Sequence, residues 1–226
     1  MKALVVDSAV TKLIISAKND DKSASLVLDI GMKQSQTLLG AIDYVLEKVE
    51  LTAADLDYLA LTSGPGSFTG LRLSYSALKA ISLAFGTPVY GLSALKCYSN
   101  AYLNFNLPVL SCIDANKERF YCGIYKADEV LLEDGDYTTE DLLKQVEKYE
   151  NLIISGPDAL KFSNIIKEKI PQQKFICPEL QPLSTESLFI LAEEKINKGE
   201  KPLEDYDGPV YLRASEAEIL HNQKAE

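Results

Sequence analysis

A glycine-rich loop is the segment of this 226-residue chain whose composition points most directly to chemistry. The loop reads Ser63-Gly-Pro-Gly-Ser-Phe-Thr-Gly-Leu-Arg72 and lies between a predicted strand and a predicted helix. Glycines let the backbone turn tightly and expose N–H groups at a helix N-terminus, which attracts anions. The candidates for holding a phosphate are Gly64, Gly66, Ser67, Thr69 and Gly70. The loop matches neither G-x-x-x-x-G-K-[ST] nor G-x-G-x-x-G, so a purely structural strand-to-helix turn is the alternative.

Two aspartates add to this possible nucleotide site. Asp7, followed by Ser8, ends the first predicted strand of the chain, and Asp114 ends the first strand of the second half. Carboxylates at such strand ends commonly hold Mg²⁺ and position phosphates, so ATP or ADP with Mg²⁺ is the cofactor this arrangement would take. The alternative is that each carboxylate only accepts N–H groups of its own turn. Lys117 and Arg119 are either phosphate contacts or ordinary surface residues.

The charge balance and the single histidine exclude other chemistry. His221 is the only histidine, so a Ser-His-Asp triad or a two-histidine metal site within the body of the fold is excluded. The chain carries 33 acidic against 23 basic residues, a formal charge of -10, and has no run of lysines or arginines. Because phosphate neutralisation needs clustered basic residues, we expect this chain to contact nucleic acid only indirectly.

Cysteine spacing and hydropathy indicate the compartment. The four cysteines, Cys97, Cys112, Cys122 and Cys177, form no C-x-x-C pair and mostly lie in apolar stretches, which favours reduced core thiols over disulfides or zinc. The N-terminal segment lacks the length of a signal-peptide core, and no window approaches a membrane span. We therefore expect a soluble, cytoplasmic protein without a membrane partner.

The periodicity of apolar residues predicts the same order of elements in each half of the chain. In the first half, strands are expected at 2–7, 11–17, 23–29, 57–62 and 88–91, and helices at 34–49, 70–85 and 93–103. In the second half, strands are expected at 107–114, 118–127, 130–132, 152–155 and 174–176, and helices at 138–149, 158–169 and 185–198. This duplicated order, with an aspartate after each first strand, predicts an α/β fold of two ribonuclease-H-like, actin-like lobes, the second reduced in size, with a cleft between them. The expected divisions are 1–104, 105–206 and a C-terminal segment 207–226 with a helix at 214–223.

The predicted helix 70–85 is apolar around much of its circumference. A helix that lies on one core needs only an apolar stripe, so something else must cover the second face. Small residues along it would allow close approach of another helix. A subunit interface shared with helix 34–49 and burial inside its own lobe are the two interpretations.

The chain also resembles a known family. The similarity lies in the loop Gly64-Pro-Gly-Ser-Phe-Thr-Gly-Leu-Arg72, in the segments 59–63 and 86–91 on either side of it, and in Asp7-Ser8, residues 113–115 and Pro209-Val-Tyr-Leu-Arg213. In these segments the chain is similar to the TsaB (YeaZ) family of the actin-like superfamily, which includes ATPases, sugar kinases and heat-shock chaperones. The resemblance implies a protein that partners the catalytic subunit TsaD, together with the ATPase TsaE, in placing a threonylcarbamoyl group on the tRNA adenosine next to the anticodon. Two sites depart from the usual family pattern: Gln34 stands where many members have His, and Asn116 where many have Arg.

The resemblance further implies a non-catalytic subunit. Ala94 and Tyr98 stand where the catalytic relative has two metal-binding histidines, so no metal and no metal-dependent catalysis are expected here. Members of the family pair through the first-lobe helices, as homodimers or on TsaD. The interface residues expected on this basis are Leu38, Ile42, Leu71, Tyr75 and Leu78. The competing hypotheses are a stand-alone ATPase or kinase of the actin-like superfamily and a glycoprotease.

Overall fold

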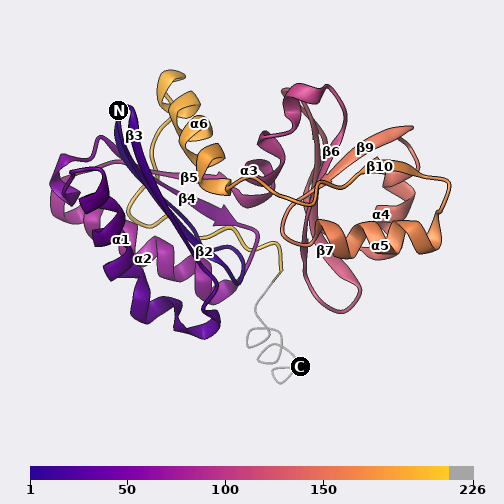
Figure 1. Cartoon of the computed structure of the whole chain (residues 1–226), viewed down its shortest axis with the longest axis horizontal. Coiled ribbons are helices and arrows are strands. Elements are labelled where there is room, and N and C mark those ends of the chain that lie inside the picture. Colours follow the sequence, from indigo (N-terminus) through magenta and orange to yellow (C-terminus); the bar gives the residue numbers. More distant parts are fainter. Residues whose placement is uncertain (214–226) are drawn as a thin grey trace.

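Two five-stranded sheets, one in each half of the chain, organise the structure (Figure 1). The computed structural model describes residues 1–213, apart from the side chain of Met32. The helix expected at 214–223, with His221, lies outside the described residues. Within the described part of the chain, no helix is both long enough and apolar enough to cross a membrane.

The first sheet has the strand order β3-β2-β1-β4-β5. Its strands are β1 (Lys2–Asp7), β2 (Leu13–Asn19), β3 (Lys22–Leu28), β4 (Tyr58–Gly64) and β5 (Val89–Ser93). β1 runs antiparallel to β2 and parallel to β4, so hairpins build one side of the sheet and helical crossovers build the other. β1 and β4 are buried on both faces and read as continuous apolar runs, whereas exposure alternates along the edge strand β3.

Helices cover both faces of the first sheet. They are α1 (Gln34–Lys48), α2 (Phe68–Phe85), α3 (Ala94–Asn100) and α6 (Ser184–Asn197), with 3₁₀ turns at Gly31–Lys33, Ala53–Asp55 and Leu103–Phe105. α1 and α2 lie on one face, and α3 and α6 on the other (Figure 1). α2 begins at Phe68, earlier than predicted, because the Ser67 side chain accepts the Gly70 N–H as an N-cap. It ends at Phe85, and the following residue, Gly86, has the left-handed conformation (φ 74°) typical of a helix C-terminus.

The second sheet repeats the order of the first, as β10-β9-β6-β7-β8. Its elements are β6 (Val109–Asp114), β7 (Arg119–Lys126), β8 (Glu129–Thr138), α4 (Thr139–Val146), β9 (Asn151–Ser155), α5 (Ala159–Lys169) and β10 (Lys174–Ile176). α4 and α5 cover one face, where Phe120 packs edge-on against Phe162 with ring centroids 5.1 Å apart. The duplicated lobe predicted from the sequence is confirmed.

Two second-half predictions are corrected. The sequence places the predicted helix 185–198 in the second lobe, but α6 packs on the first sheet. Its buried apolar residues pack on the side of β1 and β4 opposite α1 and α2, and they are Leu188, Leu191 and Ala192. The strand predicted at 130–132 extends over Glu129–Thr138 because the acidic residues in it have partners, Arg119 for Asp136 among them.

All four cysteines are free. Cys97, Cys112 and Cys122 are buried, and Cys177 is partly exposed. This confirms the expectation of reduced thiols, three of them in the core.

Candidate functional site

A cleft of about 910 Å³ lies between the two lobes. The ends of β1 and β6 open into it, so Asp7 and Asp114 both line it, as do Gly66 and Ser67 of the glycine loop. The segment between β10 and α6 forms another wall. The fold therefore brings four of the eight residues predicted as a nucleotide site to one cleft, whereas Ser8, Gly64 and Gly70 are buried and do not line it.

The carboxylate of Asp7 is fully buried and has hydrogen-bond donors on both oxygens. Oδ1 accepts the N–H of Ala9 (3.0 Å) and the hydroxyl of Thr62 (2.9 Å). Oδ2 accepts the hydroxyl of Tyr98 (3.0 Å) and that of Ser184. Four elements, β1, β4, α3 and α6, thus converge on one side chain. A Mg²⁺ ion, which needs carboxylate or water oxygens in an octahedron, does not fit at Asp7 unless Tyr98 or Ser184 withdraws.

The glycine loop packs on the turn that follows β1. The Ser67 N–H donates to the Ala9 carbonyl at 2.6 Å. A Cβ on Gly66 would lie 2.2 Å from that same carbonyl oxygen, and a Cβ on Gly70 would lie 2.1 Å from the Ser8 carbonyl oxygen. Glycine is therefore required at both positions so that the loop can pack against the backbone of residues 8 and 9. This agrees with the interpretation of the loop as a structural strand-to-helix turn.

Ser8 and Thr69 complete the predicted set. The Ser8 hydroxyl donates to the Gly70 carbonyl and lies 2.8 Å from the Ser74 hydroxyl, so it is engaged inside the first lobe. Thr69 is exposed on the first turn of α2. The N–H of Gly70 is used by the Ser67 cap. The loop therefore offers a phosphate fewer N–H groups than its sequence suggests.

Asp114 lies at the second-lobe wall of the cleft. Its carboxylate accepts a hydrogen bond from the N–H of Asn116 (3.0 Å) and forms an ion pair with Lys161 (2.5 Å). Its backbone N–H donates to the Asp158 carboxylate (2.7 Å). Burial, and then the nearby Asp114 carboxylate, raise the pKa of Asp158. Asn116 has a left-handed backbone (φ 60°), which Asn tolerates better than most residues.

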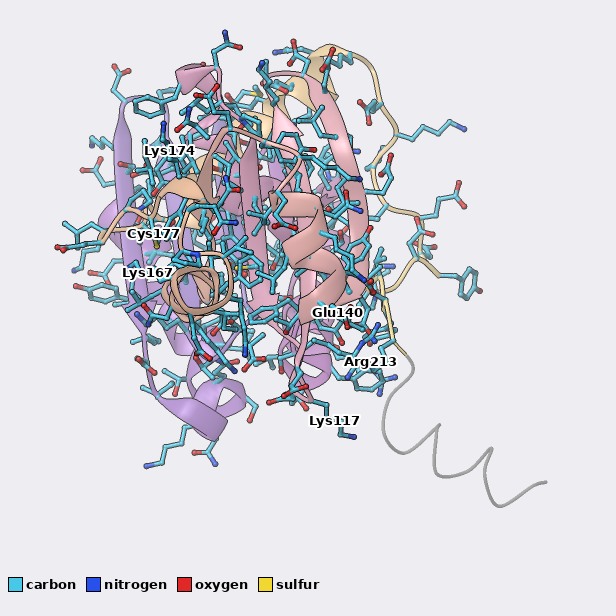
Figure 2. All side chains as sticks on the ribbon, turned by 90° about the vertical axis from the view of Figure 1, so that its right-hand side faces the viewer. Lys117, Glu140, Lys167, Lys174, Cys177 and Arg213 are labelled. Atoms are coloured by element: carbon cyan, nitrogen blue, oxygen red, sulfur yellow. The ribbon has the colours of Figure 1, made fainter. Side chains whose placement is uncertain are left out.

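The two basic residues considered as phosphate contacts, Lys117 and Arg119, follow the Asp114 turn. Arg119 pairs with Asp136 at 2.9 Å. Burial raises the pKa of Asp136, but the hydrogen bonds from Arg213 and Arg119 outweigh it and hold that pKa below its usual value. Lys117 lies at the lower edge of the view in Figure 2, on the turn between β6 and β7. No cluster of phosphate-binding cations forms from Lys117 and Arg119.

The two positions at which the resemblance implies metal histidines in the catalytic relative, Ala94 and Tyr98, lie on α3. Ala94 is fully buried in the contact between the lobes, and Tyr98 donates to Asp7. Burial, followed by the Asp7 charge, raises the pKa of the Tyr98 phenol well above its usual value, so it stays a donor. Among residues 1–213, no three His, Cys, Asp or Glu side chains are arranged to hold a metal ion. Gln34, another departure, donates to the Thr11 carbonyl (2.7 Å) and so fixes the turn between β1 and β2.

The predicted interface residues need correction. All five are at most 5% exposed: Leu38, Ile42, Leu71, Tyr75 and Leu78. Four of them face the core of the first lobe, and Leu71 packs in the contact between the lobes. The apolar side chains that α1 and α2 present to solvent are others: Leu39 (64% exposed), Tyr44 (48%), Leu83 (89%) and Phe85 (52%). We call these four residues the outer apolar face. A helix that is apolar all round has one apolar stripe toward the core and a second toward solvent. The apolar residues outside the core stripe were therefore the sequence signal for the exposed side.

Comparisons with known proteins agree with this architecture. A family model described as "TsaD: tRNA N6-adenosine threonylcarbamoyltransferase" matches residues 32–220. The chain is 25% identical to the tRNA threonylcarbamoyladenosine biosynthesis protein TsaB of Bacillus subtilis, over 99% of this chain and 100% of that protein. Among solved structures, a Pseudomonas aeruginosa protein with similarity to peptidase YeaZ aligns with a TM-score of 0.77, at 21% identity, over 94% of this chain and 99% of that one. A Bacteroides thetaiotaomicron protein with an actin-like ATPase fold aligns with a TM-score of 0.51, at 10% identity, over 84% and 95%. The actin-like fold predicted from the sequence is confirmed.

Proposed function

This chain belongs to the TsaB/YeaZ family, within the group covered by the TsaD family model, and we propose that it is a non-catalytic subunit for threonylcarbamoylation of the tRNA adenosine next to the anticodon. It acts by binding a TsaD-like catalytic subunit, with a TsaE-like ATPase as the further component. The modification takes place in the cytoplasm. Any ATP or ADP with Mg²⁺ is bound by the assembled complex rather than by this chain alone.

The outer apolar face carries this proposal. Leu39, Leu83 and Phe85 are large side chains held in water by rigid helices, and α1 and α2 lie side by side (Figure 1). Removing such side chains from water stabilises a complex by about 25 cal/mol for each Å² of apolar surface buried. The TsaD-like partner covers this face in the complex, and a second copy of the chain covers it in the free homodimer.

The cleft supports a subunit without its own catalysis. The Asp7 oxygens already accept four hydrogen bonds, and the glycine loop uses its close approach for packing. A stand-alone ATPase would need these groups for a metal and phosphates. With a formal charge of -10, this chain leaves contact with the tRNA to its partner.

A pair of single substitutions tests the proposal. Leu83→Lys and Leu180→Lys both replace a leucine that is 89% exposed, but Leu83 lies on the outer apolar face and Leu180 lies at the cleft. Leu83→Lys should weaken binding to the TsaD-like protein of the same organism by about 2 kcal/mol, roughly thirtyfold in Kd, as at interface hot spots. It should also lower threonylcarbamoyladenosine in the tRNA of cells that depend on this chain.

Leu180→Lys is the matched control and should leave both measurements unchanged. Binding is measured by titration of the purified proteins, and the modified nucleoside by mass spectrometry of digested tRNA. Equal behaviour of the two variants would overturn the assignment of this face. Absence of any complex between the wild-type chain and the TsaD-like protein would overturn the proposed function itself.

A further inference from the structure

The last described segment of the chain, residues 200–213, runs from the end of α6 along the first lobe to the second lobe (Figure 1). We call it the strap. The Leu203 N–H donates to the Val89 carbonyl on the edge strand β5, and the Val210 N–H donates to the Ser63 carbonyl near the end of β4, both at 2.7 Å. The edge strand β5 exposes unpaired backbone groups, and the pairing of β4 with β5 is irregular around Ser63, so both carbonyls are open to the strap.

Lys79 of α2 fastens the middle of the strap. Its ammonium donates to three backbone carbonyls, those of Glu204 (2.7 Å), Asp205 (2.7 Å) and Asp207 (2.5 Å). An ammonium has three donors, so this one turn uses its full capacity. The Asp207 carboxylate accepts the Glu204 N–H at 2.7 Å and closes the same turn. The shape of the strap here depends on a side chain of α2.

An aromatic contact seats the strap nearer the second lobe. The Tyr211 ring stacks on Phe68 with centroids 4.4 Å apart, and Arg72 lies over Phe68 while its Nε donates to the Tyr211 hydroxyl at 3.0 Å. Gly64 leaves room for the strap, since a Cβ there would lie 2.3 Å from the Val210 carbonyl oxygen. The strap is therefore seated along α2 from Lys79 to the helix N-terminus.

Arg213 connects the strap to the second lobe. Its guanidinium donates to both carboxylate oxygens of Asp136 (2.8 and 3.1 Å) and to the carbonyl of Ala115 (3.1 Å). The Asp136 side chain is only 13% exposed, so this ion pair is better shielded from solvent than most surface pairs. Ala115 lines the cleft, and Arg213 lies near the turn that carries Lys117 (Figure 2).

We propose that the strap couples the surface of α2 to the width of the cleft between the lobes. Lys79 fixes the position of the strap on α2. Arg213 holds the end of the strap to the turn between β6 and β7, which lines the cleft, so a shift of the strap moves this turn. Once either attachment is lost, the lobes are held by contacts such as Ser93 to Asp134 and the packing around α3, and the cleft samples wider separations. The coupling needs only this chain and does not depend on the proposed function.

Distances between spin labels across the cleft test the coupling in the full chain. Labels at Lys12→Cys and Leu160→Cys report the cleft width, because both residues are exposed and line opposite walls, with Cys177→Ser in the background. We expect one narrow distance distribution in the parent protein. Lys79→Met and Arg213→Ala should each shift it to longer distances and broaden it. The double variant should shift no further than either single variant, since both break one serial connection.

Lys48→Met is the matched control. Lys48 is an exposed lysine of the neighbouring helix α1 whose partners among residues 1–213 are local, Glu47 and the Tyr44 ring, so its removal should leave the distribution unchanged. Asp207→Ala, at an exposed position, gives a second way to disturb the Lys79 turn and should reproduce the shift even if Lys79→Met fails to fold. A parent-like distribution in Asp207→Ala or Arg213→Ala, or additive shifts in the double variant, would overturn the coupling.

Discussion

Removal of one hydroxyl group tests whether Asp7 is a structural anchor rather than a metal ligand. Tyr98→Phe deletes a single donor to the Asp7 carboxylate and keeps the volume of the ring, so it creates no cavity. The other three donors remain, and Asp7 stays buried. The change therefore isolates the contribution of the bond between α3 and β1.

The size of the expected effect follows from the burial of the pair. A hydrogen bond to a charged group contributes about 1.5–3 kcal/mol to stability. For a protein of this size each kcal/mol lowers Tm by roughly 2–4 °C, so Tyr98→Phe should lower Tm by roughly 3–12 °C. Tyr44→Phe is the control, because Tyr44 is 48% exposed on α1 and surface changes usually stay within about 0.5 kcal/mol.

Thermal unfolding followed by circular dichroism measures both variants, with and without Mg²⁺. A ligand that binds only the folded state raises Tm, so Mg²⁺ at millimolar concentration should leave the wild-type Tm unchanged. If Tyr98→Phe unfolds with the wild-type Tm, Asp7 is not the anchor described here. If Mg²⁺ raises the Tm of the wild type and raises that of Tyr98→Phe further, the Asp7 carboxylate is a metal ligand that the Tyr98 hydroxyl partly blocks.

Two further predictions concern the glycine loop and the thiols. Gly66→Ala should lower the free energy of unfolding by about 2–3 kcal/mol in urea titrations, because its Cβ would meet the Ala9 backbone, whereas Gly40→Ala, in the middle of α1 with no atom within 4 Å, should raise it by about 0.5–1 kcal/mol. Equal effects would remove the close-approach argument. In the native protein near neutral pH, a thiol reagent should modify Cys177 alone, since burial raises the pKa of Cys97, Cys112 and Cys122, and it should modify all four in denaturant.

Local pattern was enough to predict the two lobes. Period-two and period-3.6 spacing found nearly every strand and helix, and the aspartate after each first strand indicated the duplication. Asp7 and Asp114 do line one cleft. What local pattern lacks is the identity of the sheet on which a helix packs. The apolar stripe of α6 suits either lobe, and only the folded chain shows that it covers β1 and β4.

The contacts missed by sequence reasoning all join residues far apart in the chain. Ser184 reaches Asp7 across 177 positions, and Arg213 reaches Asp136 across 77. The acidic residues of β8, taken with their sequence neighbours alone, predict a loop. Their partners lie on other elements, since Asp134 binds Ser93 and Asp136 binds Arg213. The choice of Leu38 over Leu39 failed for a related reason: spacing defines a stripe on a helix but not the side from which the sheet approaches.

Asp7 shows how one position of this fold suits two different roles. The carboxyl end of a central strand places a side chain in the cleft whatever its role, so an aspartate there is consistent with metal binding and with support of the fold alike. The neighbours decide between them. Tyr98, at a position of a metal histidine in the catalytic relative, turns its hydroxyl to Asp7, and Ser184 does the same from α6. These two hydrogen bonds join α3 and α6 to the first sheet, which favours a rigid support for the helices that bear the outer apolar face.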